Sequence, residues 1–275
     1  TCMVDCEHPF MPASWANPFG HKRGKPRQKG LTMVIDKGLG LTAYCDLLEL
    51  ASPYIDIYKL GFGTTALYPP NVLQQKLSRA TALGLHIMPG GTFFEIAIQQ
   101  STIKAYMQQI RSLGFSAVEI SDGTFPLSFK QRREAIERAV DAGLVVYTEV
   151  GKKSAGYRAE RNELLETLAF DLQQGASHVI VEARESGTVG VFDGNGKIEQ
   201  SFILDVVRAA KKNAERLVWE APQKDQQVCL IQSLGVDVNL GNIACTDVLS
   251  VETLRRGLRG DTALMLAEGR SAPCE

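Results

Sequence analysis

From residue 30 onward, short apolar runs alternate with longer stretches in which apolar residues recur at helical spacing. The short runs are rich in Val, Ile and Leu, which is typical of strands buried on both faces of a parallel sheet. The eight predicted strands are 31–36, 54–60, 85–89, 116–121, 144–150, 178–183, 216–221 and 236–240.

The stretches between these runs indicate helices with one apolar face. In 128–143, Ser128 is a suitable N-cap, Ala135 and Ile136 belong to an apolar stripe, and Gly143 is a suitable end. Because each crossover helix returns the chain to the same end of the sheet, strand–helix alternation predicts parallel strands. Eight such units favour a single α/β domain, a (β/α)8 TIM barrel, over residues 30–265.

An open, doubly wound sheet is the main alternative to the barrel. The segment after the first strand has only two glycines, Gly38 and Gly40, and lacks the Gly-x-Gly-x-x-Gly pattern of dinucleotide-binding sheets. Outside the barrel we expect an N-terminal arm, residues 1–29, which is solvated or docked on a neighbour, and a C-terminal tail, residues 266–275.

Composition and charge exclude several classes of protein. The formal net charge of −1 gives no reason to expect a nucleic acid or an anionic membrane as partner. No apolar run reaches the ~18 residues that a membrane span needs. The six cysteines are scattered along a chain that is long enough to be stable without disulfides, so we expect reduced thiols and a cytoplasmic location.

Polar residues cluster where the predicted strands end. In a barrel these ends meet at one mouth, where such enzymes work. A structural ion pair explains any single charged residue equally well, but a shared pocket explains the whole set better, because buried charges are costly. The residues are Asp36, Lys37, Lys59, Glu119, Ser121, Asp122, Glu149, Lys152, Lys153, Glu182, Arg184, Glu185, Glu220, Gln223, Gln226, Asn239 and Asn242.

The residue types at these ends limit the chemistry. Of four histidines, His86 and His178 fall at strand starts, so a His-based triad or zinc site is disfavoured. Carboxylate oxygens suit Mg²⁺, and the predicted metal ligands are Glu119, Glu149, Glu182 and Glu220. Cations would make the rest of the mouth electropositive and attractive to small anions. The predicted substrate-binding residues are Lys37, Lys59, Arg184, Gly90, Gly91, Gln223 and Asn239.

Nine segments, in order, resemble the phosphosulfolactate synthase family over roughly residues 30–262. They are LTMVIDKG, DIYKLGFGT, PGGTFFE, AVEISDG, TEVGKK, VEARESG, EAPQKDQQ, VNLGNIA and VETLRRGLRGDT. The resemblance implies a Mg²⁺-dependent carbon–sulfur lyase that adds sulfite to phosphoenolpyruvate. Its product is phosphosulfolactate, which in methanogens begins coenzyme M biosynthesis, and the enzyme is expected to be a homo-oligomer. The family's proposed acid maps onto Lys152 and Lys153, with Lys153 favoured and Glu149 beside them.

Two other functions are compatible with the same residues. Lys153 could form a Schiff base in a related phosphoenolpyruvate-using lyase, or the chain could be a diverged family member acting as a stress-associated or scaffold protein. Arg255, Arg256 and Arg259 either bind phosphate or pair with acids at a helix end.

Overall fold

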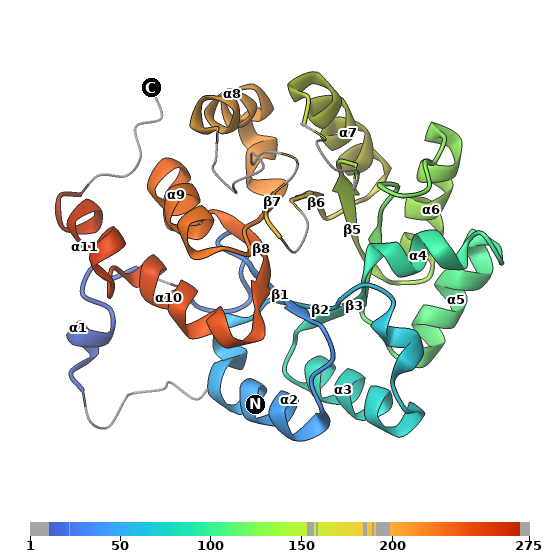
Figure 1. Cartoon of the computed structure of the whole chain (residues 1–275), viewed down its shortest axis with the longest axis horizontal. Helices are drawn as coiled ribbons and strands as arrows, with labels where there is room; N and C mark the ends of the chain where they lie inside the picture. Colours follow the sequence, from blue (N-terminus) through green and yellow to red (C-terminus); the bar gives the residue numbers. More distant parts are fainter. Residues whose placement is uncertain are drawn as a thin grey trace.

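Eight parallel strands form the centre of the molecule, and helices surround them (Figure 1). The structure is a computed structural model and describes residues 11–21, 23–152, 157, 159–183, 186–188, 190 and 199–269. The strands follow one another in the order β3-β2-β1-β8-β7-β6-β5-β4, each parallel to its neighbours. This arrangement confirms the predicted (β/α)8 barrel.

The strands are β1 (Thr32–Asp36), β2 (Ile57–Leu60), β3 (His86–Pro89), β4 (Ala117–Ile120), β5 (Val145–Val150), β6 (His178–Val181), β7 (Leu217–Glu220) and β8 (Asn239–Ala244). The helices are α1 (Ala13–Ala16), α2 (Leu41–Ala51), α3 (Pro70–Ala82), α4 (Gly91–Ala97), α5 (Ile103–Leu113), α6 (Phe129–Asp141), α7 (Arg161–Gln174), α8 (Gln200–Ala210), α9 (Lys224–Leu234), α10 (Val248–Arg256) and α11 (Gly260–Ala267). None of these helices is long and apolar enough to cross a membrane.

The last strand lies further along the chain than the sequence predicts. The apolar run 236–240 predicts a strand there, but β8 spans Asn239–Ala244. Its sequence, NLGNIA, contains two asparagines and a glycine, so it lacks the apolar pattern of the other strands. The pairing of β8 with β1 also shifts register between Leu240 and Ile243, which is a β-bulge at Gly241 and Asn242.

The barrel closes at a seam between β3 and β4. Backbone ladders join every other neighbouring pair, but the described residues show none between these two strands. The Ser116 side chain bridges them instead: its Oγ accepts from the Ile87 amide at 2.9 Å and donates to the Leu85 carbonyl at 3.4 Å. Side-chain hydrogen bonds therefore supply part of the closure that backbone pairing supplies elsewhere.

The barrel interior is apolar at the level where most strands begin, which we call the base; the other end is the mouth. Met33, Ile57, Met88, Tyr147 and Val218 belong to this buried interior cluster. Two further apolar clusters fill the space between the strands and the surrounding helices. Side chains at the mouth therefore lie directly above a packed apolar interior.

The described part of the N-terminal arm packs against the base of its own barrel. Arg23 pairs with Glu252 at 3.2 Å and Arg27 with Asp56 at 3.0 Å, and the Arg256 guanidinium donates to the Ala16 carbonyl. In Figure 1 the arm, including α1, lies beside α10 and α11. These contacts anchor the arm on the barrel, although most of its described residues are exposed.

Candidate active site

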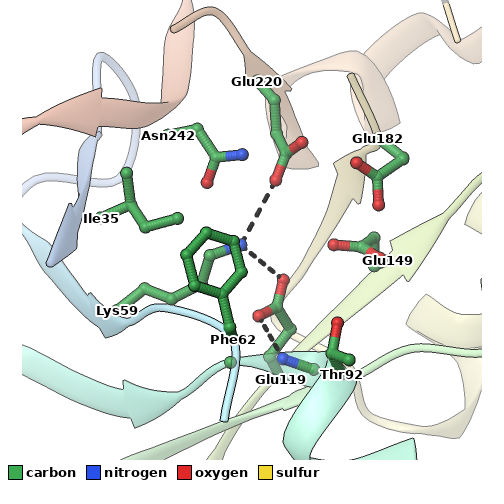
Figure 2. Close-up of a pocket in the computed structure, with 11 residues that line it drawn as sticks. Ile35, Lys59, Phe62, Thr92, Glu119, Glu149, Glu182, Glu220 and Asn242 are labelled. Carbon is green, nitrogen blue, oxygen red and sulfur yellow. Dashed lines mark hydrogen bonds and ion pairs between the residues drawn. The ribbon is translucent and has the colours of Figure 1, made fainter. Parts of the chain in front are cut away.

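A cavity of about 120 Å³ lies at the mouth of the barrel. Figure 2 shows four carboxylates along one side of it, with Lys59 opposite and the Phe62 ring in front. The lining residues are Ile35, Lys59, Phe62, Gly90, Gly91, Thr92, Glu119, Glu149, Glu182, Glu220 and Asn242.

The alternation of side chains along each strand explains this lining. Interior residues Ile57, Ala117, Tyr147, Ile180 and Val218 belong to the apolar cluster. Side chains two positions further along a strand point to the same face. Those next positions are occupied by the charged residues Lys59, Glu119, Glu149, Glu182 and Glu220. The sequence thus places a charged layer directly on an apolar one.

Lys59 joins two sides of the charged layer. Its Nζ lies 2.9 Å from Glu119 Oε1 and 3.3 Å from Glu220 Oε1, and its residue is only 4% exposed. Burial lowers the pKa of Lys59, but the charges of Glu119, Glu220 and Glu149 more than offset it, so the pKa lies above its ordinary value. Lys59 is therefore an ammonium ion held between carboxylates.

Glycine at position 91 allows one of these carboxylates to approach the backbone. The Gly91 amide donates to Glu119 Oε2 at 2.7 Å at the start of α4. A Cβ at Gly91 would lie 2.6 Å from Ser121 Oγ and 3.1 Å from Glu119 Cγ, so a larger residue would displace both. Gly90 is similarly confined, because a Cβ there would lie 2.8 Å from the backbone of Phe62.

Three of the carboxylates lie close enough together to bind one cation. One oxygen each from Glu119, Glu149 and Glu220 lies within 4.8 Å of the other two, and all three residues are buried. Glu182 lines the cavity next to them, so four carboxylates face a single described ammonium group in this lining. Carboxylate oxygens gathered in one buried site are the hard ligands that a divalent cation such as Mg²⁺ prefers.

The acidic inner wall differs from the electropositive mouth that the sequence predicts. Lys37 and Lys152 are both exposed and do not line the cavity. Lys153 and Arg184, which were expected to contribute positive charge, lie outside the described residues. The described lining therefore contains four carboxylates and one described ammonium group, that of Lys59.

Two predicted substrate-binding residues lie away from the cavity in the structure. Gln223 is exposed at the start of α9 and donates to the Ser186 carbonyl at 2.6 Å. Asn239 lies at the beginning of β8, where Oδ1 accepts from the Leu31 amide and Nδ2 donates to the Leu217 carbonyl. The later start of β8 explains this position of Asn239, because the residue that reaches the mouth is Asn242.

Some charged residues that could have belonged to the pocket form structural ion pairs instead, which is the alternative given in the sequence analysis. Asp36 accepts from Lys76 Nζ at 2.6 Å, and both side chains are fully buried. Arg256 pairs with Glu252 at 2.8 Å, Arg259 lies 3.5 Å from Asp261, and Arg255 donates to backbone carbonyls near β8. Pairing at the end of α10, rather than phosphate binding, accounts for these arginines.

The sequence analysis did not identify Arg132, which holds the backbone of Glu149 from the helix layer. Arg132 on α6 donates to the Glu149 carbonyl at 3.0 Å and pairs with Asp171 Oδ2 at 2.6 Å. Burial lowers the pKa of Arg132, but Asp171 and Asp122 more than offset it and raise the pKa above its ordinary value. Its position within a helical stripe of the sequence gave no sign of this contact.

The fold and this site define a TIM-barrel enzyme with a buried acidic cluster at the carboxyl ends of its strands. The family model for (2R)-phospho-3-sulfolactate synthase (ComA) matches residues 20–261. The chain belongs to this family, as the ordered sequence segments indicated.

Similar proteins support both the family and the fold. The phosphosulfolactate synthase of Methanothermobacter thermautotrophicus is 43% identical over 88% of this chain and 94% of its own length. That of Methanocaldococcus jannaschii is 44% identical over 86% of this chain and 94% of its own length. The solved structure of 3-hexulose-6-phosphate synthase from Salmonella typhimurium matches with a TM-score of 0.54 and 10% identity, over 87% of this chain and all of that one. At that identity the match concerns the fold alone.

Proposed function

We propose that the chain catalyses the Mg²⁺-dependent addition of sulfite to phosphoenolpyruvate, giving phosphosulfolactate. The observation that carries this proposal is the buried cluster of Glu119, Glu149 and Glu220, bridged by Lys59, at the mouth of a barrel of this family. Its relatives named phosphosulfolactate synthase span nearly the same length of chain.

The reaction forms one carbon–sulfur bond and one carbon–hydrogen bond. The sulfur lone pair of sulfite attacks the methylene carbon of phosphoenolpyruvate, and the double-bond electrons move toward the carboxylate. A proton then adds to the carbon that bears the phosphate, and no group leaves. The protein must therefore hold two anions together, stabilise the charge on the carboxylate and deliver a proton.

The carboxylates of Glu119, Glu149 and Glu220 would hold the Mg²⁺ ion, with Glu182 beside them. When bound, the ion supplies positive charge that stabilises the electron-rich carboxylate of the reacting substrate. Hard oxygen ligands and a compact buried cluster suit Mg²⁺, which supports the assignment of the metal.

Besides pairing with carboxylates, Lys59 would contact the anionic substrate when a cation is bound. Its ammonium group pairs with Glu119 and Glu220, which are two of the residues that would hold the cation. Release from one carboxylate would leave the ammonium available for an anionic substrate. Cation binding and substrate binding are then coupled through a single side chain.

Lys153 is the proposed proton donor. Lys152, which precedes it, lies two residues after the end of β5, on the mouth side of the barrel. We expect Lys153→Ala to abolish product formation with no change in the folding transition, and full turnover by this variant would remove Lys153 from the mechanism. Trapping with borohydride and a carbonyl substrate separates this role from Schiff-base chemistry, because only a Schiff base leaves a covalent adduct.

The decisive experiment mixes the purified protein with phosphoenolpyruvate, sulfite and Mg²⁺ and identifies the product by mass spectrometry. Phosphosulfolactate should form, and a metal chelator should stop its formation. Product formation at an unchanged rate in the chelator would refute the metal role. No binding of phosphoenolpyruvate and no product would favour a non-catalytic family member.

We also propose a cytoplasmic, homo-oligomeric enzyme. The described cysteines Cys45, Cys229 and Cys245 are free thiols, which fits a reducing compartment. Several large apolar side chains are mostly exposed: Leu67 is 83% exposed, Phe129 71% and Leu264 73%. An assembly would cover side chains of this kind. Light scattering of the purified protein tests the oligomeric state.

A further inference from the structure

Asn242 occupies an unusual backbone position at the edge of the cavity. It lies on the β-bulge of β8, and its φ of 52° falls in the left-handed region that few residues other than glycine adopt. Bulges next to active sites commonly redirect a side chain. Figure 2 shows the result here, because the Asn242 amide points into the cavity between Ile35 and Glu220.

The amide of Asn242 has no partner in the described part of the chain. The residue is 4% exposed, and its Oδ1 is buried with no hydrogen bond, nor does any described residue accept from Nδ2. Asn239, three residues earlier on the same strand, uses its Oδ1 once and its Nδ2 twice in backbone hydrogen bonds. Asn239 holds the fold together, whereas Asn242 keeps its hydrogen-bonding capacity inside the cavity.

We propose that Asn242 is a direct contact for the anionic substrate, an assignment that rests on the function proposed above. The amide nitrogen donates to an anionic oxygen of the enol phosphate. The other described polar groups in the lining are mainly carboxylates, which repel such an oxygen, and Lys59, which two carboxylates already hold. A neutral amide adds a donor to this acidic wall without adding a charge that would compete for the cation.

The variant Asn242→Gly tests the contact, because glycine adopts a positive φ without strain and lacks the amide side chain. Calorimetry should show that its dissociation constant for phosphoenolpyruvate, with Mg²⁺ present, rises about tenfold or more. Its affinity for Mg²⁺ alone should be unchanged, and its thermal unfolding temperature should not fall. Lys211→Gly is the matched control, because Lys211 has a φ of 53° on an exposed segment away from the cavity and should leave both affinities unchanged.

A second variant, Asn242→Asp, keeps the shape and replaces the donor with another negative charge. It should weaken phosphoenolpyruvate binding further than Asn242→Gly does. Substrate binding by either variant at the wild-type affinity overturns the contact. An equal loss of affinity for Mg²⁺ alone and for substrate in Asn242→Gly also overturns it, because the amide would then act on the cation. If the wild-type protein itself binds no phosphoenolpyruvate, the proposed function fails and the contact fails with it.

Discussion

The mouth and the base of the barrel both bury charged side chains, but they balance the charges differently. At the base, Arg23 and Arg256 share Glu252, and Arg27 pairs with Asp56. At the mouth, four carboxylates line the cavity with Lys59, which pairs with two of them. Ion pairs at the base join the arm to α10 and to the start of β2, whereas the clustered carboxylates at the mouth offer several oxygens to one cation. The comparison separates structural from functional charges within one barrel.

The largest effect should come from removing one carboxylate at the mouth. We expect Glu119→Gln to lower the rate of product formation by about 10³-fold or more, because the charge that holds the cation and stabilises the reacting carboxylate is reduced. The measurement is initial rate together with Mn²⁺ binding as a substitute cation. Glu252→Gln, the matched change at the base, should lower thermal stability and leave the rate per folded molecule unchanged. Equal losses of rate in both variants would contradict the distinction between the two ends.

A smaller effect should follow from removing the one described cation of the cavity. Lys59→Met leaves Glu119 and Glu220 buried without their partner, which we expect to cost about 3–5 kcal/mol of unfolding free energy without metal. Saturating Mg²⁺ should recover most of this loss, because the ion replaces the missing charge. Lys76→Met is the control, since Lys76 pairs with Asp36 outside the cavity and its loss should not be recovered by Mg²⁺. Chemical denaturation with and without Mg²⁺ measures both variants, and equal recovery in the two would be the contrary result.

The smallest expected effect is a loss of unfolding free energy at acid pH, caused by His178 at the base. His178 stacks on Tyr147 in the barrel interior, and burial, with the charges of Arg216 and His86, lowers its pKa to about 4. The unfolded chain binds this proton below its ordinary pKa of about 6.5, so the contribution is complete above that pH and is lost as the pH falls toward 4. We expect a loss of about 2 kcal/mol between pH 7.5 and pH 5 that is absent in His178→Gln. Urea denaturation at the two pH values measures it, and an identical pH dependence in the variant would exclude His178 as its source.

Most of the fold follows from the sequence because the apolar runs and the helical stripes have clear periods. The strand ends also placed Glu119, Glu149, Glu182 and Glu220 at the mouth, since side chains two residues apart share a face. The exception is β8, which starts later than its apolar pattern predicts, so of the two asparagines expected at the mouth only Asn242 lies there and Asn239 does not. A bulge depends on register with a neighbouring strand, and no local pattern of the sequence specifies it.

The sequence also does not predict the hydrogen-bond and ion-pair partners of the site residues. The contact from Arg132 to the backbone of Glu149 joins α6 to β5, and the bridge from Lys59 to Glu220 spans 161 residues. Such contacts depend on the angle at which each helix packs and on the rotamer of each side chain. Residue type and position predicted which groups would meet at the mouth, but not how they pair.

The seam between β3 and β4 has a consequence for the motions of the barrel. Only side chains bridge it in the described structure, and Glu119 on β4 accepts from the Gly91 amide on the β3 side, directly at the cavity. Lys59 on β2 also reaches Glu119 on β4 across this seam, so a cation that binds Glu119 would act on the contacts between its two sides. Amide hydrogen exchange in β3 and β4 should slow when Mg²⁺ is added, while exchange in β1 and β2, which share a full ladder, should change little.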